Sequence, residues 1–247
     1  MKLGSSGRLI GVVVLILCAV GAISLFEQIP PQRLAALLGI SVSVSDGARG
    51  ISPSPSSSPS SHDGLTAEAV VSVQAFLGPT LVRQGSGVSV SSDGLVLTNI
   101  AAAPYGSGAY VYQVVLSRGD VLRASRVAFD SVTGLVLLKI DGDSFDAVLF
   151  DETVSLSAGM QLEAIAADIQ FVQFFVKRLP LWVAWSNGSR VELSMDRTLG
   201  GALHGARVVD QYGRSLGVFS WTGRPTLIDA KKINRFIDTY LASNGGY

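Results

Sequence analysis

From Ala67 onward, apolar residues come in short runs separated by clusters of turn-forming residues. Short runs rich in β-branched and aromatic side chains are typical of strands. Four turn signals fit tight turns with a positive φ angle: Asp93-Gly94, Arg118-Gly119-Asp120, Asn187-Gly188 and Gln211-Tyr212-Gly213. The predicted strands are Ala69 to Leu77, Gly87 to Ser91, Leu95 to Thr98, Tyr110 to Ser117, Val121 to Val127, Val136 to Ile140, Gln161 to Ala166, Phe171 to Val176, Val191 to Ser194, Ala206 to Val209 and Leu216 to Trp221.

The apolar spacing changes at the C-terminal end. Between Ile228 and Leu241 most apolar residues fall on one face of a helix. We therefore expect an all-β domain of two packed barrels, closed by an amphipathic C-terminal helix.

The N-terminal end carries an uncharged apolar run from Leu9 to Phe26, preceded by Lys2 and Arg8. At about 1.5 Å per residue this run spans about 27 Å, close to the hydrocarbon thickness of a bilayer. Positive residues before the run predict a cytoplasmic N-terminus and an extracytoplasmic C-terminal domain. A signal peptide cleaved near Val20-Gly21-Ala22 is the alternative. A single-pass membrane anchor is favoured because the apolar run continues beyond that point.

The segment from Ser41 to Asp63 is rich in Ser, Pro and Gly, with almost no large apolar side chain after Ile51. Such a composition is typical of flexible, disordered linkers. The expected organisation is a cytoplasmic tip and transmembrane anchor in residues 1–28, a Ser/Pro-rich linker in residues 29–65, and a β-domain in residues 66–247.

Charge and ligand-forming residues exclude several function classes. The 247 residues include 19 basic and 19 acidic side chains, so no electrostatic footprint for nucleic acid exists. Cys18 is the single cysteine and lies in the apolar run, so the exported domain forms no internal disulfide. The two histidines, His62 and His204, are far apart in sequence. We expect no metal site and no cofactor.

Three segments in the β-region carry motifs in a fixed order: Gln84 to Ala102, Asp130 to Ile140, and Arg197 to Leu203 with its following hairpin. They resemble the active-site segments of trypsin-like serine proteases of the HtrA (Deg) family. In that family the segments read Gly-Ser-Gly followed by Leu-Thr-Asn-x-His-Val, then Asp-x-x-x-Asp-Leu-Ala-Leu-Leu-Lys, then Gly-Asn-Ser-Gly-Gly-Pro-Leu. The resemblance covers about Ala67 to Leu241 and implies a trypsin-like double β-barrel.

All three triad positions implied by the resemblance are replaced. Ala101 stands at the position of the histidine base, Gly134 at that of the aspartate, and Leu199 at that of the serine nucleophile. Ser-His-Asp chemistry needs a hydroxyl, an imidazole and a carboxylate, which these residues lack. Arg197 also replaces a glycine of the oxyanion loop. The resemblance therefore implies a pseudoprotease.

The segment from Gly217 to Gly223 resembles the Gly-Ile-Val-Ser-Trp-Gly strand of trypsin-like enzymes. In the family the end of this strand pairs with substrate backbone. Ser220, Trp221 and Thr222 are therefore candidate peptide-binding residues, by addition of an extended strand. The alternative is a plain core strand.

The segment from Ile169 to Val176 is apolar apart from two glutamines. The default prediction is a core strand. If the strand is partly exposed instead, it offers an edge that a partner can bind.

The leading hypothesis is a membrane-anchored, catalytically inactive HtrA-type homologue that acts as an extracytoplasmic peptide-binding, protein-binding or regulatory module. One alternative is an active serine-type endopeptidase with non-standard residues, such as His204 with a nearby serine. Another is a purely structural tethered domain.

Overall fold

The computed structural model describes residues 69–244 apart from 107, 171–172, 197–199 and 222. The predicted anchor and linker lie outside the described residues. Within the described part, no helix is long and apolar enough to cross a bilayer.

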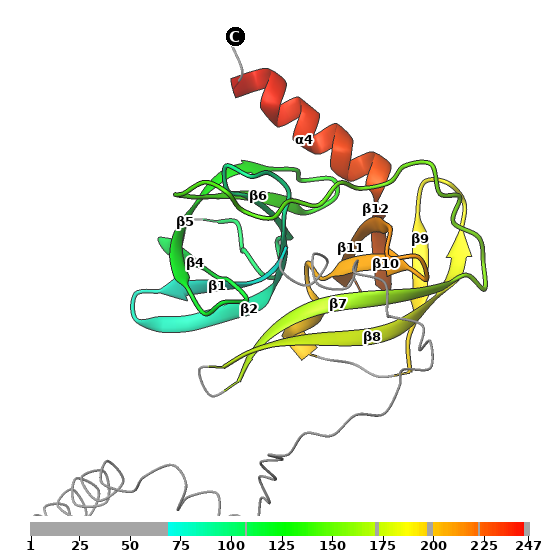
Figure 1. Cartoon of the computed structure of the whole chain (residues 1–247), viewed down its shortest axis with the longest axis horizontal. Helices are drawn as coiled ribbons and strands as arrows, with labels where there is room; N and C mark the ends of the chain where they lie inside the picture. Colours follow the sequence, from blue (N-terminus) through cyan, green and yellow to red (C-terminus); the bar gives the residue numbers. More distant parts are fainter. Residues whose placement is uncertain (1–68, 107, 171–172, 197–199, 222, 245–247) are drawn as a thin grey trace, which may run out of the picture. The chain divides into compact units, whose positions relative to one another are not determined.

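The first half of the β-domain is a closed antiparallel barrel with the strand order β1-β2-β3-β6-β5-β4 (Figure 1). Alternate side chains of each strand fill its interior, as the period of a half-buried strand requires. Val73, Val96, Val114 and Leu138 are among these core residues, each fully buried. The strands are β1 (Val70–Leu77), β2 (Thr80–Ser89), β3 (Leu95–Asn99), β4 (Tyr110–Val115), β5 (Val121–Phe129) and β6 (Leu135–Ile140).

The second half forms another closed six-stranded barrel, with the order β10-β11-β12-β9-β8-β7. Its core includes Leu181, Val183 and Phe219. The two barrels fit a trypsin-like double-barrel fold, and the predicted all-β class with a closing helix is confirmed. The elements are β7 (Gln161–Gln170), β8 (Gln173–Ser186), β9 (Val191–Ser194), the 3₁₀ helix η1 (Gly200–Leu203), β10 (Arg207–Asp210), β11 (Ser215–Trp221), β12 (Pro225–Asp229) and α4 (Ala230–Asn244).

The C-terminal helix α4 packs across both barrels. Ile233 of α4 belongs to one cluster with Leu137 of β6 and Val218 of β11. The predicted start of this helix at Ile228 is wrong, because Ile228 pairs with Val218 as part of β12. The helix begins after Asp229, whose side chain accepts a hydrogen bond from the backbone N–H of Lys232 at 3.1 Å and caps the first turn.

The predicted turns are confirmed by backbone geometry. The glycine of each signal has a positive φ angle, for example 97° at Gly94 and 78° at Gly213. At Gly94 a side chain is also excluded by contact, since an added Cβ would lie 2.5 Å from the carbonyl oxygen of Ile140.

One buried hydroxyl joins the two barrels. The Ser86 hydroxyl, on β2, donates a hydrogen bond to the carbonyl of Ala202 at 2.5 Å and accepts one from the N–H of Ala167 at 2.8 Å. The Ser86 N–H donates to the carbonyl of His204 at 2.7 Å. Its own carbonyl accepts a hydrogen bond from the Thr98 hydroxyl at 2.7 Å. Ser86 therefore connects β2 and β3 of the first barrel to β7 and η1 of the second.

We predict that Ser86→Ala lowers the free energy of unfolding by about 2–4 kcal/mol, because it leaves a buried N–H and a buried carbonyl without this partner. Ser72 provides a matched control, since it lies opposite Ser86 in the β1–β2 pair and its buried hydroxyl has no hydrogen-bond partner among the described residues. Ser72→Ala should be neutral or slightly stabilising. Urea unfolding of both variants measures the difference, and equal losses would contradict this account.

Candidate functional site

The ends of two distant strands meet between the barrels. The side-chain amide of Asn99, the last residue of β3, donates a hydrogen bond to the carbonyl of Phe219 in β11 at 3.1 Å. The chain continues from Asn99 into Ile100 and Ala101, and from Phe219 into Ser220 and Trp221. This bond therefore brings the predicted triad region and the predicted peptide-binding strand to one place.

Ala101 and Gly134 are linked at this place through Ile100. The N–H of Ile100, next to Ala101, donates to the carbonyl of Gly134 at 2.8 Å. The N–H of Ala101 donates to the side-chain oxygen of Asn99 at 3.1 Å. A Cβ added to Gly134 would lie 3.3 Å from the Cγ2 atom of Ile100, so Ile100 covers the point where a side chain would project. Neither Ala101 nor Gly134 carries a side-chain group that accepts or donates a proton in catalysis.

Leu199, Arg197 and Thr222 lie outside the described residues. The η1 turn that follows Leu199 in the chain is pressed against β2. A Cβ added to Gly201 would lie 3.0 Å from the carbonyl oxygen of Gln84. A Cβ added to Gly205 would lie 2.2 Å from the carbonyl oxygen of Ser86, so only glycine fits at this contact between the barrels.

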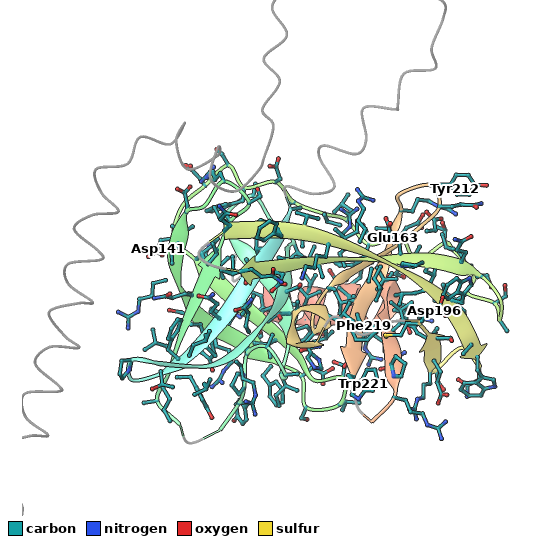
Figure 2. All side chains as sticks on the ribbon, turned by 90° about the horizontal axis from the view of Figure 1, so that it is seen from below. Asp141, Glu163, Asp196, Tyr212, Phe219 and Trp221 are labelled. Carbon is teal, nitrogen blue, oxygen red and sulfur yellow. The ribbon has the colours of Figure 1, made fainter. Side chains whose placement is uncertain are left out.

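Ser220 and Trp221 differ in their surroundings. Ser220 is buried, and its carbonyl accepts a hydrogen bond from the Thr226 hydroxyl at 3.1 Å. Trp221 pairs with Pro225 on one side, and 43% of its surface is exposed. Figure 2 shows Trp221 at the rim of the molecule and Phe219 further inside.

The backbone of Trp221 is open on the side away from β12. The N–H and carbonyl of Phe219 bond to Ala206 and Gly205, at 2.8 and 3.0 Å. Peptide groups alternate in direction along a strand, so those of Trp221 point the same way as those of Phe219. On that side no described residue bonds to the Trp221 backbone. Among the described residues, the N–H and carbonyl of Trp221 on that side therefore have no hydrogen-bond partner.

His204 is the one histidine within the described residues. Burial, and secondly the positive charge of Arg83, lower the pKa of its imidazole. Its buried Nδ1 has no hydrogen-bond partner in the described part of the chain. No described serine is therefore paired with this nitrogen, as a base activating a nucleophile through Nδ1 would require.

No metal-binding constellation appears where the structure describes the chain: no three His, Cys, Asp or Glu residues gather closely enough to hold an ion. Sequence reasoning did not single out Asn99 and Ser86, which build this region. The one available signal was the Thr-Asn pair at the end of the first motif. It did not identify the partner of Asn99, because Phe219 lies 120 positions away.

No protein-family model matches the chain, and no curated protein shows significant similarity to it. The architecture of the described residues is thus established by the two barrels themselves, which fit the trypsin-like double-barrel fold.

We predict that His204 makes the protein less stable in mild acid. The folded state holds the pKa of His204 below its ordinary value of 6.5. The unfolded chain therefore binds a proton that the folded state resists, and stability falls as the pH drops below the unfolded pKa. Urea midpoints at mildly acidic and neutral pH should differ more for the native chain than for His204→Leu. An identical pH dependence in both proteins would show that His204 has no part in it.

Proposed function

We propose that the chain is a catalytically inactive homologue of HtrA-type proteases, anchored in a membrane, whose β-domain binds an extended peptide or protein segment outside the cytoplasm. The observation that carries the proposal is the combination found at the junction of β3 and β11. The positions that would supply the base and its orienting carboxylate are Ala101 and Gly134, while no described residue bonds to the outer backbone edge at the end of β11.

The loss of the reactive groups argues for binding without turnover. Proton transfer requires an ionisable side chain within hydrogen-bond reach of the reacting atom. Ala101 has only a methyl group, and Ile100 packs against the point above Gly134. A substrate held here would meet an apolar wall where a protease has an imidazole and a carboxylate.

The retained edge argues for recognition through the backbone. An extended peptide that adds to an open strand gains hydrogen bonds independent of its sequence, and side-chain contacts supply selectivity. Ile100 and Trp221 have exposed surfaces of 40% and 43% for such contacts. A regulatory module that captures an unfolded or extended segment needs this kind of surface.

The proposed location rests on the apolar run from Leu9 to Phe26. Its length suits a single membrane span, and the basic residues before it favour a cytoplasmic N-terminus. Residues 29–65 would then tether the β-domain at the membrane surface.

We predict that the full chain in detergent retains a subset of peptides from a mixed library and releases them uncut, as read by mass spectrometry. Trp221→Ala should weaken this capture about tenfold or more, as expected for an aromatic contact in the centre of a site. Trp185→Ala is the matched control, because Trp185 is 45% exposed and lies on β8. New cleavage products, or labelling by a fluorophosphonate, would establish a hydrolase instead. Equal effects of the two substitutions would remove β11 from the binding site.

We also predict that the full chain stays with the membrane fraction after extraction with alkaline carbonate. Deletion of residues 9–26 should release it, because the remaining chain has no comparable apolar run. Replacement of the deleted run by an unrelated apolar sequence of equal length should restore membrane retention. Release of the intact full chain by carbonate would contradict the anchor.

A further inference from the structure

One end of the first barrel gathers exposed apolar side chains. All neighbouring strands of this barrel are antiparallel, so the segments that follow β1, β3 and β5 lie at the same end. The register agrees, because Leu77 at the end of β1 pairs with Tyr110 at the start of β4. We call this end the loop end. It consists of residues 77–81, 100–106, 108–109 and 130–134.

Four large apolar side chains project from three separate segments of the loop end. Leu77 and Leu81 flank the tip of the β1–β2 hairpin and are 48% and 44% exposed. Tyr105 and Val132, from the other two segments, are 57% and 90% exposed. Figure 1 shows the β1–β2 hairpin on the outer side of the first barrel, away from the second. Exposed apolar groups gathered in this way mark an interaction surface, and we call these four side chains the apolar patch.

Tyr105 is held in its exposed position by packed neighbours. Its ring stacks on Phe129 with 4.6 Å between the ring centroids, and the guanidinium of Arg126 lies 4.5 Å from the centre of the Tyr105 ring. The carbonyl of Pro104 accepts hydrogen bonds from the Tyr112 hydroxyl at 2.7 Å and from Arg126 at 3.3 Å. The tyrosine is therefore pre-positioned, so little further ordering is needed when a partner binds it.

Positive charge borders the apolar patch. Arg83 on β2 and Arg235 on α4 are exposed, and Arg126 adds a third cation. Arg235 and Val132 line the same cleft of about 530 Å³, which places this cation beside the patch. The loop end itself has one carboxylate, Asp130, which accepts hydrogen bonds from two N–H groups of its own turn. Cations therefore outnumber carboxylates at this end.

The opposite end of the same barrel is acidic. Figure 2 shows Asp141 well away from the tip of the cyan β1–β2 hairpin. Five carboxylates stand against three cations there, and two of the cations form ion pairs with two of these carboxylates. Such a charge asymmetry turns the loop end toward a negatively charged surface. The residues at the acidic end are Asp93, Asp120, Asp141, Asp143 and Asp146, with Arg118, Arg123 and Lys139.

We infer that the loop end docks on a bilayer surface that contains anionic lipids. The two leucines and Val132 enter the boundary between headgroups and acyl chains, and Tyr105 lies at the headgroup level, where tyrosine is enriched. The arginines bordering the patch contact lipid phosphates. The inference rests on the proposed membrane anchor, which would keep the patch close to a bilayer, so that even weak docking is populated.

A bilayer suits this surface better than a second protein does. The apolar groups stand on the tips of three segments with cations behind them, and a fluid lipid surface can accommodate tips of this kind. A protein partner would need a surface complementary in shape. Ile100 lies at the same end and connects the patch to the junction of β3 and β11. Docking therefore holds that junction close to the membrane surface.

Quenching by lipids in vesicles tests the docking. The full chain, with Cys18→Ala as the background, is reconstituted in vesicles of phosphatidylcholine and phosphatidylglycerol whose acyl chains carry a nitroxide. A fluorescent label at Leu77→Cys or at Val132→Cys should be quenched. A label at Val121→Cys is the matched control and should not be quenched, because Val121 is 58% exposed but lies at the opposite end of the barrel. Equal quenching at all three positions, or no quenching at the loop end, would overturn the proposal.

Removal of the hairpin leucines tests whether the patch itself makes the contact. With the label at Val132→Cys, Leu77→Ser combined with Leu81→Ser should lower the equilibrium constant for docking about tenfold or more, because both side chains leave water on docking. Both are exposed in the free domain, so their replacement leaves the core intact. Val121→Ser is the control and should have no effect. An equal loss in the control, or no loss in the leucine variant, would contradict docking through the patch.

Lipid composition tests the role of the cations. Arg83→Gln combined with Arg235→Gln should reduce quenching in vesicles that contain phosphatidylglycerol and leave it unchanged in phosphatidylcholine alone. Quenching that responds neither to phosphatidylglycerol nor to these substitutions would contradict the preference for anionic lipids.

Two further measurements separate this inference from the proposed function. A chain that resists extraction with alkaline carbonate but shows no quenching at the loop end keeps its anchor and contradicts the docking. Peptide capture in detergent does not depend on the docking, so either can fail without the other. Self-association of the full chain in detergent that is lost in Leu77→Ser with Leu81→Ser would assign the patch to a second copy and overturn the proposal.

Discussion

The two barrels depend on one buried hydroxyl. Ser86 bonds to Ala167 and Ala202 through its side chain, and to His204 through its N–H. Since a buried polar group costs free energy unless each partner is present, these bonds fix the position of one barrel against the other. The nearby bond from Asn99 to Phe219 can form only in that arrangement. The position of the junction of β3 and β11 is therefore a consequence of how the barrels join.

The junction of β3 and β11 brings together segments that resemble parts of a protease site, while the two described positions aligned with the triad, Ala101 and Gly134, carry no reactive group. Ala101 and Gly134 are held together by the backbone bond between Ile100 and Gly134, although neither side chain can move a proton. What this place still provides is backbone: the outer N–H and carbonyl of Trp221, to which no described residue bonds.

Local patterns of the sequence were sufficient for most of the fold. Glycine turns and alternating apolar residues predicted the strands from β3 to β7, because these signals act over a few residues. The predicted strand ended at Val176, but β8 continues through Pro180 to Ser186, because the nitrogen of Pro180 faces away from β7 and its missing N–H costs no bond to that strand. The strand β12 was not predicted, because its apolar residues lie directly before the helix and fit the same helical spacing as the residues that follow Asp229. The contacts that build the site, such as Asn99 with Phe219, join residues 120 positions apart and leave no local signal.

The central claim is that the junction of β3 and β11 binds an extended segment and leaves it intact. Amide hydrogen exchange of the full chain, measured with and without a captured peptide, tests this most directly. The account predicts slower exchange at Ile100, Ala101 and Trp221 in the complex, with the mass of the peptide unchanged. Cleavage of the peptide, or protection confined to residues outside this junction, would contradict it.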